Sequence, residues 1–181
     1  LWRLSTRHGS KGVLGDVGIH ILDYATFIAG ETPAEVSCRL KTFDKTEGGR
    51  IGDYVLDAND SFVMHLELAG GAVGTVGATR FASGHLNDLR LRIYGEAGGL
   101  EVGFERGVSR LAGSLGADMP AAAWTEIAAP AVPTIYARFI AAIRGEGPAD
   151  PDFGRGAALQ AMLDLAEASA ARGGASLPLR A

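Results

Sequence analysis

Between residues 35 and 105 the sequence repeats one pattern, in which apolar residues occupy every second position of short segments separated by glycine-containing turns. The segments are 35–43, "EVSCRLKTF", then 60–82, "DSFVMHLELAGGAVGTVGATRFA", and 89–105, "LRLRIYGEAGGLEVGFE". A period of two is typical of half-buried strands, and the glycines inside the second and third segments indicate hairpin turns. Consecutive strands joined by tight turns predict a predominantly antiparallel sheet.

Helical patterns flank these strands. Predicted helices cover Leu14 to about Gly30, Thr134 to Arg144, and about Phe153 to Arg172, because each is free of internal proline and ends at glycine or shortly before proline. The region Leu111 to Pro133 is predicted to be irregular, and a short strand is expected in "ASLPL", 175–179. This order predicts an α+β fold with helices packed on one face of an open antiparallel sheet.

Composition restricts the possible partners. The 181 residues are 47% hydrophobic and carry a net charge of -4 without a run of like charges, which argues against nucleic acid and membranes as partners. The lone Cys38 cannot form an internal disulfide, so a reducing, cytoplasmic location is expected. No alternating βαβ pattern with G-x-G-x-x-G is present, so no Rossmann domain is expected here. We expect residues 1–181 to form one domain of a longer protein, since the sequence does not begin with methionine.

The first helical segment contains three ionisable residues in an apolar run, "GDVGIHILDY", 15–24. At the helical repeat, Asp16, His20 and Asp23 lie at about 0°, 40° and 340°, so they share one stripe. Because the rest of this helix is apolar nearly all round, it is predicted to be buried, with the three polar groups at a cavity or internal boundary.

Several interpretations of this polar stripe remain open from the residues alone. Asp16 could cap the helix, and His20 could be a structural histidine bonded to Asp16 or Asp23, which spacing alone favours. A shared metal ion is less favoured, because only one histidine and no cysteine are near. In the catalytic interpretation His20 exchanges protons near neutral pH, while Asp16 binds a substrate hydroxyl or orients the imidazole.

The segment 2–31, "WRLSTRHGSKGVLGDVGIHILDYATFIAGE", resembles the start of the C-terminal domain of the Gfo/Idh/MocA oxidoreductases. In that family a Trp-Arg segment and a glycine-rich turn precede a helix of pattern D-x-G-x-H-x-x-D. The matching positions are Trp2, Arg3, Asp16, Gly18, His20 and Asp23. The segments 57–76, 91–102 and 136–179 are similar to later parts of the same domain, and the family's Gly-Gly-Gly is "SKG" here, 10–12.

The resemblance implies a parent enzyme with an N-terminal Rossmann domain that binds NAD or NADP, and a homodimer or homotetramer formed through the open sheet face. It implies His20 as the catalytic acid/base, Asp16 and Arg3 as substrate-binding residues, and Asp23 and Gly18 as structural support. A lysine from an E-K-P motif usually completes the site, and none of the three lysines here lies in such a motif.

The expected function is therefore that of a substrate-binding and oligomerisation domain of an NAD(P)-dependent oxidoreductase acting on a sugar, cyclitol or similar polyol. No cofactor or metal is expected on this chain itself. The alternative is a non-catalytic binding or dimerisation module with the same fold. Arg80, His85 and Tyr136 are polar or aromatic residues that the pattern leaves unassigned.

Overall fold

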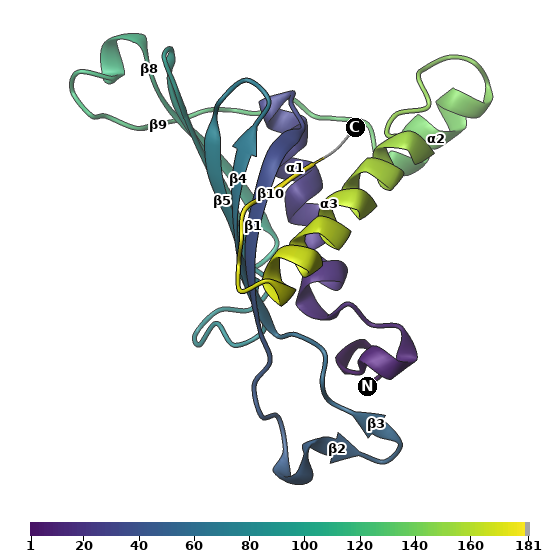
Figure 1. Cartoon of the computed structure of the whole chain (residues 1–181). Helices are drawn as coiled ribbons and strands as arrows, with labels where there is room; N and C mark the ends of the chain where they lie inside the picture. Colours follow the sequence, from purple (N-terminus) through teal and green to yellow (C-terminus); the bar gives the residue numbers. More distant parts are fainter. Residues whose placement is uncertain (180–181) are drawn as a thin grey trace. The chain divides into compact units, whose positions relative to one another are not determined.

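The computed structural model describes residues 1–179 and divides into two compact units, one made of residues 1–81 with those from 151 onward, the other of residues 82–150. The fold is α+β, and every strand pair is antiparallel, as the sequence predicts (Figure 1). No helix among the described residues has both the length and the apolar content needed to cross a bilayer.

The first unit is built on a four-stranded sheet of order β10-β1-β4-β5. Its strands are β1 (Pro33–Lys41), β4 (Ser61–Leu68), β5 (Val73–Thr79) and β10 (Leu177–Pro178). Apolar side chains alternate along β1 and β4, so Val36 and Met64 point into the core while Arg39 and His65 are exposed. This period of two is the pattern by which the strands were predicted.

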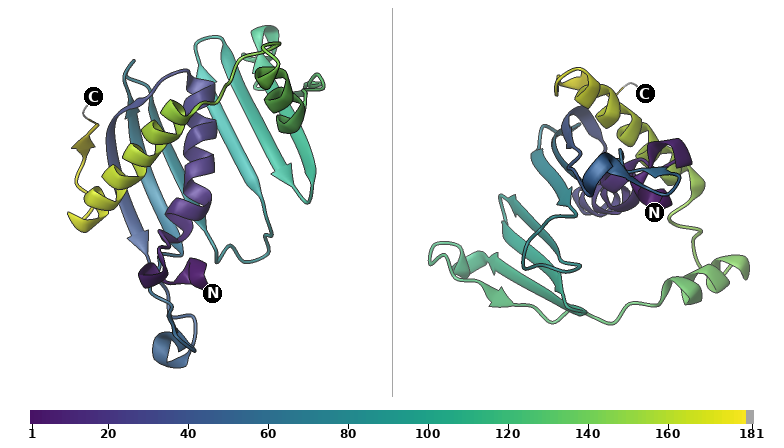
Figure 2. Two further views of the ribbon diagram at one scale, coloured as in Figure 1. Left: turned by 90° about the vertical axis from the view of Figure 1, so that its right-hand side faces the viewer. Right: turned by 90° about the horizontal axis from the view of Figure 1, so that it is seen from below.

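Two helices, α1 (Ile19–Ala29) and α3 (Phe153–Ala171), cover one face of this sheet (Figure 2). Their side chains Leu22, Met162 and Leu163 join those of the strands in one hydrophobic cluster. The helix α1 ends at Gly30, whose φ of 68° is left-handed and suits a helix C-terminus. The predicted helices at 14–30 and 153–172 are confirmed.

Smaller elements complete the first unit. The 3₁₀ turns η1 (Trp2–Leu4) and η2 (Thr6–His8) precede η3 (Leu14–Gly18), a π-helical turn that leads directly into α1. Between β1 and β4 the chain forms η4 (Glu47–Gly49) and a two-stranded sheet of β2 (Arg50–Ile51) and β3 (Tyr54–Val55). The ring of His8 packs against that of Tyr54 at a tilt of 41°, with centroids 4.5 Å apart.

The second unit contains a four-stranded sheet of order β6-β7-β8-β9 and one helix. The elements are β6 (Leu89–Gly95), β7 (Gly98–Glu105), β8 (Val108–Leu115), η5 (Gly116–Asp118), β9 (Thr125–Glu126) and α2 (Ile135–Ile143). The prediction of irregular structure over 111–133 is wrong in part, because β8 pairs with β7 along its whole length and β9 pairs with β8. The pairing with β7 overrides the weak strand propensity of the Ala, Gly and Ser residues in β8.

Candidate functional site

The chain before the first helix folds back, so that Arg3 lies near the beginning of that helix. The hydroxyl of Ser10 donates a hydrogen bond to the carbonyl of Arg3 at 2.6 Å and accepts one from the amide of Gly12 at 2.9 Å. Gly12 has a φ of +63°, a conformation that favours glycine. The turn "SKG" therefore retains glycine at the position where the backbone conformation requires it.

Asp16 lies in the π-helical turn η3, immediately before α1. Such turns are rare and often occur at functional sites. Gly18 ends the turn against β4, and a Cβ atom added there would lie 2.9 Å from Cε1 of Phe62. Glycine at position 18 thus lets the helix approach the sheet closely, which fixes where Asp16 lies relative to β4 and β5.

The carboxylate of Asp16 lies between two guanidinium groups. Its Oδ2 accepts a hydrogen bond from Nη2 of Arg80 at 2.8 Å, and its Oδ1 lies 3.3 Å from Nε of Arg3. The side chains of Asp16 and Arg80 are each 29% exposed, whereas that of Arg3 is 59% exposed. Asp16 is therefore held mainly by Arg80, and it does not cap the helix with its side chain.

A cavity of about 340 Å³ borders this cluster within the first unit. Trp2, Arg3 and Asp16 form one part of its wall, and Gln160 and Leu163 of α3 form another. The wall combines an aromatic ring with charged and amide groups, a composition suited to a small polar ligand.

Lys11 lines the same cavity and is fixed to α3. Its Nζ donates hydrogen bonds of 2.7 Å to Asp164 and to Glu167. These bonds, that to Asp164 first, raise the pKa of Lys11 above its ordinary value, and the pKa of Asp164 is lowered in turn. Lys11 is thus a fixed cation at neutral pH and is unsuited to accept a proton from a ligand.

The prediction that the polar stripe is buried is wrong for His20. Its side chain is exposed, and it forms no hydrogen bond within residues 1–179, so it is not a structural histidine bonded to Asp16 or Asp23. The reason is that α1 packs with one side only, where Leu22 and Thr26 are buried, while Phe27 is 71% exposed. Apolar residues all round this helix therefore do not indicate complete burial.

Asp23 points to a different partner from Asp16. Its Oδ1 accepts a hydrogen bond of 2.8 Å from Nε of Arg155, whose Nη2 also donates to the carbonyl of Asp23 and to the hydroxyl of Thr26. This cluster ties α1 to α3. The structure thus brings Asp16 together with Arg3, but places Asp23 in a separate cluster.

Arg80 and Arg155 are the residues that the sequence pattern left out of the site. Arg80 is 64 residues from Asp16 in the sequence, and Arg155 is 132 residues from Asp23. No sequence motif links either arginine to its aspartate. The only signal was the presence of Asp16 and Asp23 in an apolar helix, because such carboxylates need a partner.

The strand pairs of residues 1–179 are all antiparallel, so these residues contain no βαβ unit of the kind whose helix N-terminus holds a pyrophosphate. Over residues 1–179, no three His, Cys, Asp or Glu side chains gather closely enough to hold a metal ion.

Residues 1–101 match the family model of the GFO/IDH/MocA C-terminal domain. The chain belongs to this family. A levoglucosan dehydrogenase from Pseudarthrobacter phenanthrenivorans is 30% identical over 119 residues, which are 58% of this chain and 30% of that protein.

Solved structures of family members superpose on the whole chain. An oxidoreductase domain protein from Kribbella flavida is 26% identical with a TM-score of 0.82, covering 100% of this chain and 55% of that one. A levoglucosan dehydrogenase in complex with NADH and levoglucosan is 25% identical with a TM-score of 0.85, covering 100% of this chain and 54% of that one. This GFO/IDH/MocA chain therefore spans about half the length of these structures.

Proposed function

We propose that this chain forms the substrate side of an NAD(P)-dependent oxidoreductase that acts on a CH–OH group of a sugar, cyclitol or similar polyol. The observation that carries the proposal is Asp16 in the wall of a cavity of about 340 Å³, one helical turn before an exposed histidine. The likeness to levoglucosan dehydrogenase supports a carbohydrate-like substrate. NAD or NADP would supply the hydride exchange, and it would be held by a Rossmann domain outside residues 1–179.

In this proposal His20 accepts the proton that the substrate hydroxyl loses on oxidation, or returns it on reduction. The imidazole of His20 is exposed and forms no hydrogen bond within residues 1–179, so it is free to contact a bound hydroxyl, and histidine is the side-chain type most used for proton exchange in catalysis. Asp16 binds a neighbouring hydroxyl of the substrate. Arg80 holds Oδ2 of Asp16 at 2.8 Å, which leaves lone pairs of the carboxylate available toward the cavity.

Arg3 and the supporting residues have separate roles in the proposal. Arg3 is exposed in the cavity wall and would donate hydrogen bonds to the substrate. Gly18 supports the site by allowing close packing against Phe62, and Asp23 supports it by joining α1 to Arg155 of α3.

The test uses the protein that carries this chain together with its dinucleotide-binding domain, assayed with levoglucosan, simple sugars and inositols. Because an acid/base group contributes about 10²- to 10⁴-fold, His20→Ala should lower kcat/KM by that factor. His85→Ala is the control, since His85 is an exposed histidine that pairs with Asp88, lies in the second unit and belongs neither to the cavity wall nor to the sheet face considered below, and it should leave kcat/KM unchanged. If His20→Ala stayed within a few-fold of wild type, the role of His20 would be refuted, whereas absence of turnover in the wild-type protein would favour the non-catalytic binding module.

We also propose that the uncovered face of the β10-β1-β4-β5 sheet makes a homodimer or homotetramer contact. This face carries the charged Arg39 and Glu67 together with Val63, which is 50% exposed. A mixed face of this kind is typical of non-obligate protein interfaces. Light scattering should give at least a dimer, and a strict monomer at micromolar concentration would contradict this assignment.

A further inference from the structure

Two consecutive residues immediately before β4, Asn59 and Asp60, contact both segments that carry the Asp16–Arg80 pair. Asn59 bonds to the turn that begins the first helix, and Asp60 bonds to the residue after β5. Asp16 and Arg80 are far apart in the sequence, so their meeting depends on such a link between the two segments.

Asn59 satisfies the start of the helix that carries Asp16. Its Oδ1 accepts a hydrogen bond from the amide of Leu14 at 3.0 Å, and its Nδ2 donates to the carbonyl of Lys11 at 2.7 Å. Its own carbonyl accepts from the amide of Val13 at 2.9 Å. The first amides of a helix have no partner within the helix, and no side chain at the cap position of η3 supplies one. Asn59 therefore acts as the cap from a distant part of the chain.

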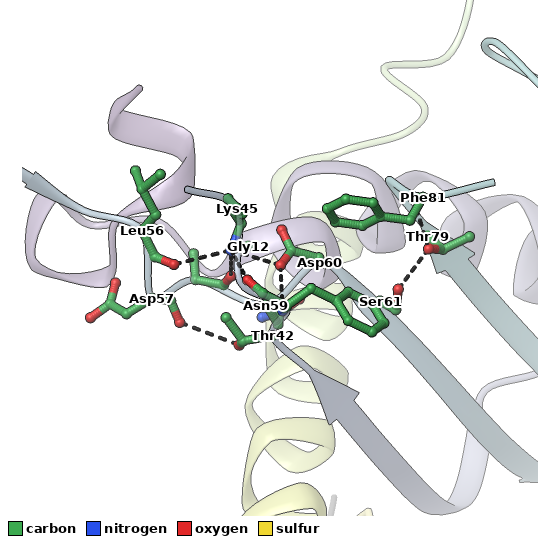
Figure 3. Close-up of polar contacts among 12 residues, drawn as sticks. Gly12, Thr42, Lys45, Leu56, Asp57, Asn59, Asp60, Ser61, Thr79 and Phe81 are labelled. Carbon is green, nitrogen blue, oxygen red and sulfur yellow. Dashed lines mark hydrogen bonds and ion pairs between the residues drawn. The ribbon is translucent and has the colours of Figure 1, made fainter. Parts of the chain in front are cut away.

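The contact between Asn59 and this turn is also close in space. A Cβ atom added at Gly12 would lie 2.4 Å from the carbonyl oxygen of Asn59 and 2.5 Å from its Cγ. Figure 3 shows Gly12 and Asn59 side by side. The backbone at Gly12 therefore packs directly against Asn59. Gly12 lies two residues before Leu14 and four residues before Asp16.

Asp60 fixes the other half of the pair. Its carbonyl accepts a hydrogen bond from the amide of Arg80 at 2.9 Å. Its side chain is fully buried, and Oδ2 accepts a hydrogen bond from the amide of Phe43 at 2.9 Å. The same oxygen lies 2.7 Å from Nζ of Lys45 (Figure 3). Lys45 also donates a hydrogen bond to the carbonyl of Leu56. Through Phe43 and Lys45 the carboxylate of Asp60 is therefore tied to both ends of the loop between β1 and β4.

We propose that Asn59 is a positioning residue for Asp16, and that Asp60 with Lys45 positions the backbone of Arg80. One rigid dipeptide then sets the distance between the two ends of the ion pair and the direction in which Asp16 faces the cavity. The expected effect on kcat/KM rests on the function proposed above. The expected effect on the geometry of the Asp16–Arg80 ion pair does not.

The first experiment measures the ion pair itself, in chain 1–181, by the rate at which phenylglyoxal modifies Arg80, followed by mass spectrometry. Asp16→Asn is the reference for a weakened pair and should make Arg80 react several-fold faster. Asn59→Ala should produce a similar increase. Ser169→Ala is the matched control, because Ser169 is fully buried and bridges the amide of Cys38 and the carbonyl of Ala175 away from this site.

Equal Arg80 rates in Asn59→Ala and wild type would overturn the proposal, as would an equal acceleration in Ser169→Ala. If Asn59→Ala does not fold, Asn59→Asp replaces it, since this variant retains the acceptor for Leu14 and loses the donor to Lys11. Its Arg80 rate should lie between those of wild type and Asp16→Asn, and a rate equal to wild type would again overturn the proposal.

The second experiment measures kcat and KM in the protein with its dinucleotide-binding domain, at a temperature where all variants are folded. Asn59→Ala should lower kcat/KM, by up to about 10²-fold, because a small misplacement of a binding group has effects of that size. Ser169→Ala should lower thermal stability and leave kcat/KM unchanged. If the wild-type protein turned over none of these substrates while Asn59→Ala accelerated modification of Arg80, the proposed function would fail and the positioning role would stand.

Discussion

The two units of this chain contain similar sheets but differ in burial. Each has four strands, all paired antiparallel. In the first unit Val36, Met64 and Leu163 belong to a cluster of side chains that are almost completely buried. Among the described residues, none of the fully buried hydrophobic side chains comes from 82–150. In α2, Tyr136 is 79% exposed and Ile143 is 67% exposed.

The difference shows that a regular strand ladder does not by itself provide a core. Pairing satisfies the backbone in both sheets, but hydrophobic stabilisation scales with the apolar area that is removed from water. The first sheet gains that area because α1 and α3 cover it. The stability of the chain therefore resides mainly in the first unit, which also holds the cluster around Asp16.

The largest effect is expected from a core truncation in the first unit. Leu163→Ala on α3 should lower the free energy of unfolding by about 2–5 kcal/mol, because Leu163 is 1% exposed and its loss leaves a cavity. Ile143→Ala on α2 removes a similar side chain that is 67% exposed, and should change the free energy by no more than about 0.5 kcal/mol. Urea titration followed by circular dichroism compares them, and equal effects would contradict the contrast between the units.

A somewhat smaller effect is expected at alkaline pH. Burial raises the pKa of the Cys38 thiol from 9.0 to about 11, so between these values the unfolded chain loses a proton that the folded chain keeps. The free energy of unfolding should therefore fall as pH rises from about 9 to about 11, by about 2–3 kcal/mol from this group. Urea titrations across this range measure the fall. In Cys38→Ala the fall in the free energy of unfolding over this pH range should be smaller by about 2–3 kcal/mol. An identical pH dependence in the variant and the wild type would refute the assignment to Cys38.

The smallest effect is expected at the helix N-termini. Asp152 caps α3 by accepting from the amide of Arg155, and Thr134 caps α2 by accepting from the amide of Ala137. Asp152→Ala should lower the free energy of unfolding of the first unit by about 1 kcal/mol. Thr134→Ala should leave that transition unchanged and increase amide hydrogen exchange in α2. A shift of the main transition by Thr134→Ala would show that α2 contributes to the stable core.

Much of the fold could be predicted because its signals are local. Hairpin turns at Gly70 and Gly71, the helix end at Gly30 and the alternation in β1 depend on neighbouring residues, and the structure confirms each. The strand β8 was missed because its residues have weak strand propensity and its pairing with β7 decides its conformation.

The candidate site could be predicted only in part. Spacing alone favoured a structural His20, and only the resemblance to the pattern D-x-G-x-H-x-x-D indicated a functional helix. The chain's membership of the GFO/IDH/MocA family agrees with that resemblance. The catalytic role of His20 and the binding roles of Asp16 and Arg3 stay predictions. The expectation that the three polar groups lie at a cavity or internal boundary was wrong for His20, which is exposed, because helical periodicity does not tell which side of a helix is covered.

The sequence by itself predicted most of the helices and strands, pointed to the family, and named candidate residues for proton exchange and hydroxyl binding. Only the tertiary structure decided that Asp16 pairs with Arg80, that Asp23 pairs with Arg155 and that His20 is exposed. The physical reason is range. Turn and periodicity signals act over a few residues, whereas an ion pair between residues 64 or 132 positions apart depends on how whole elements pack.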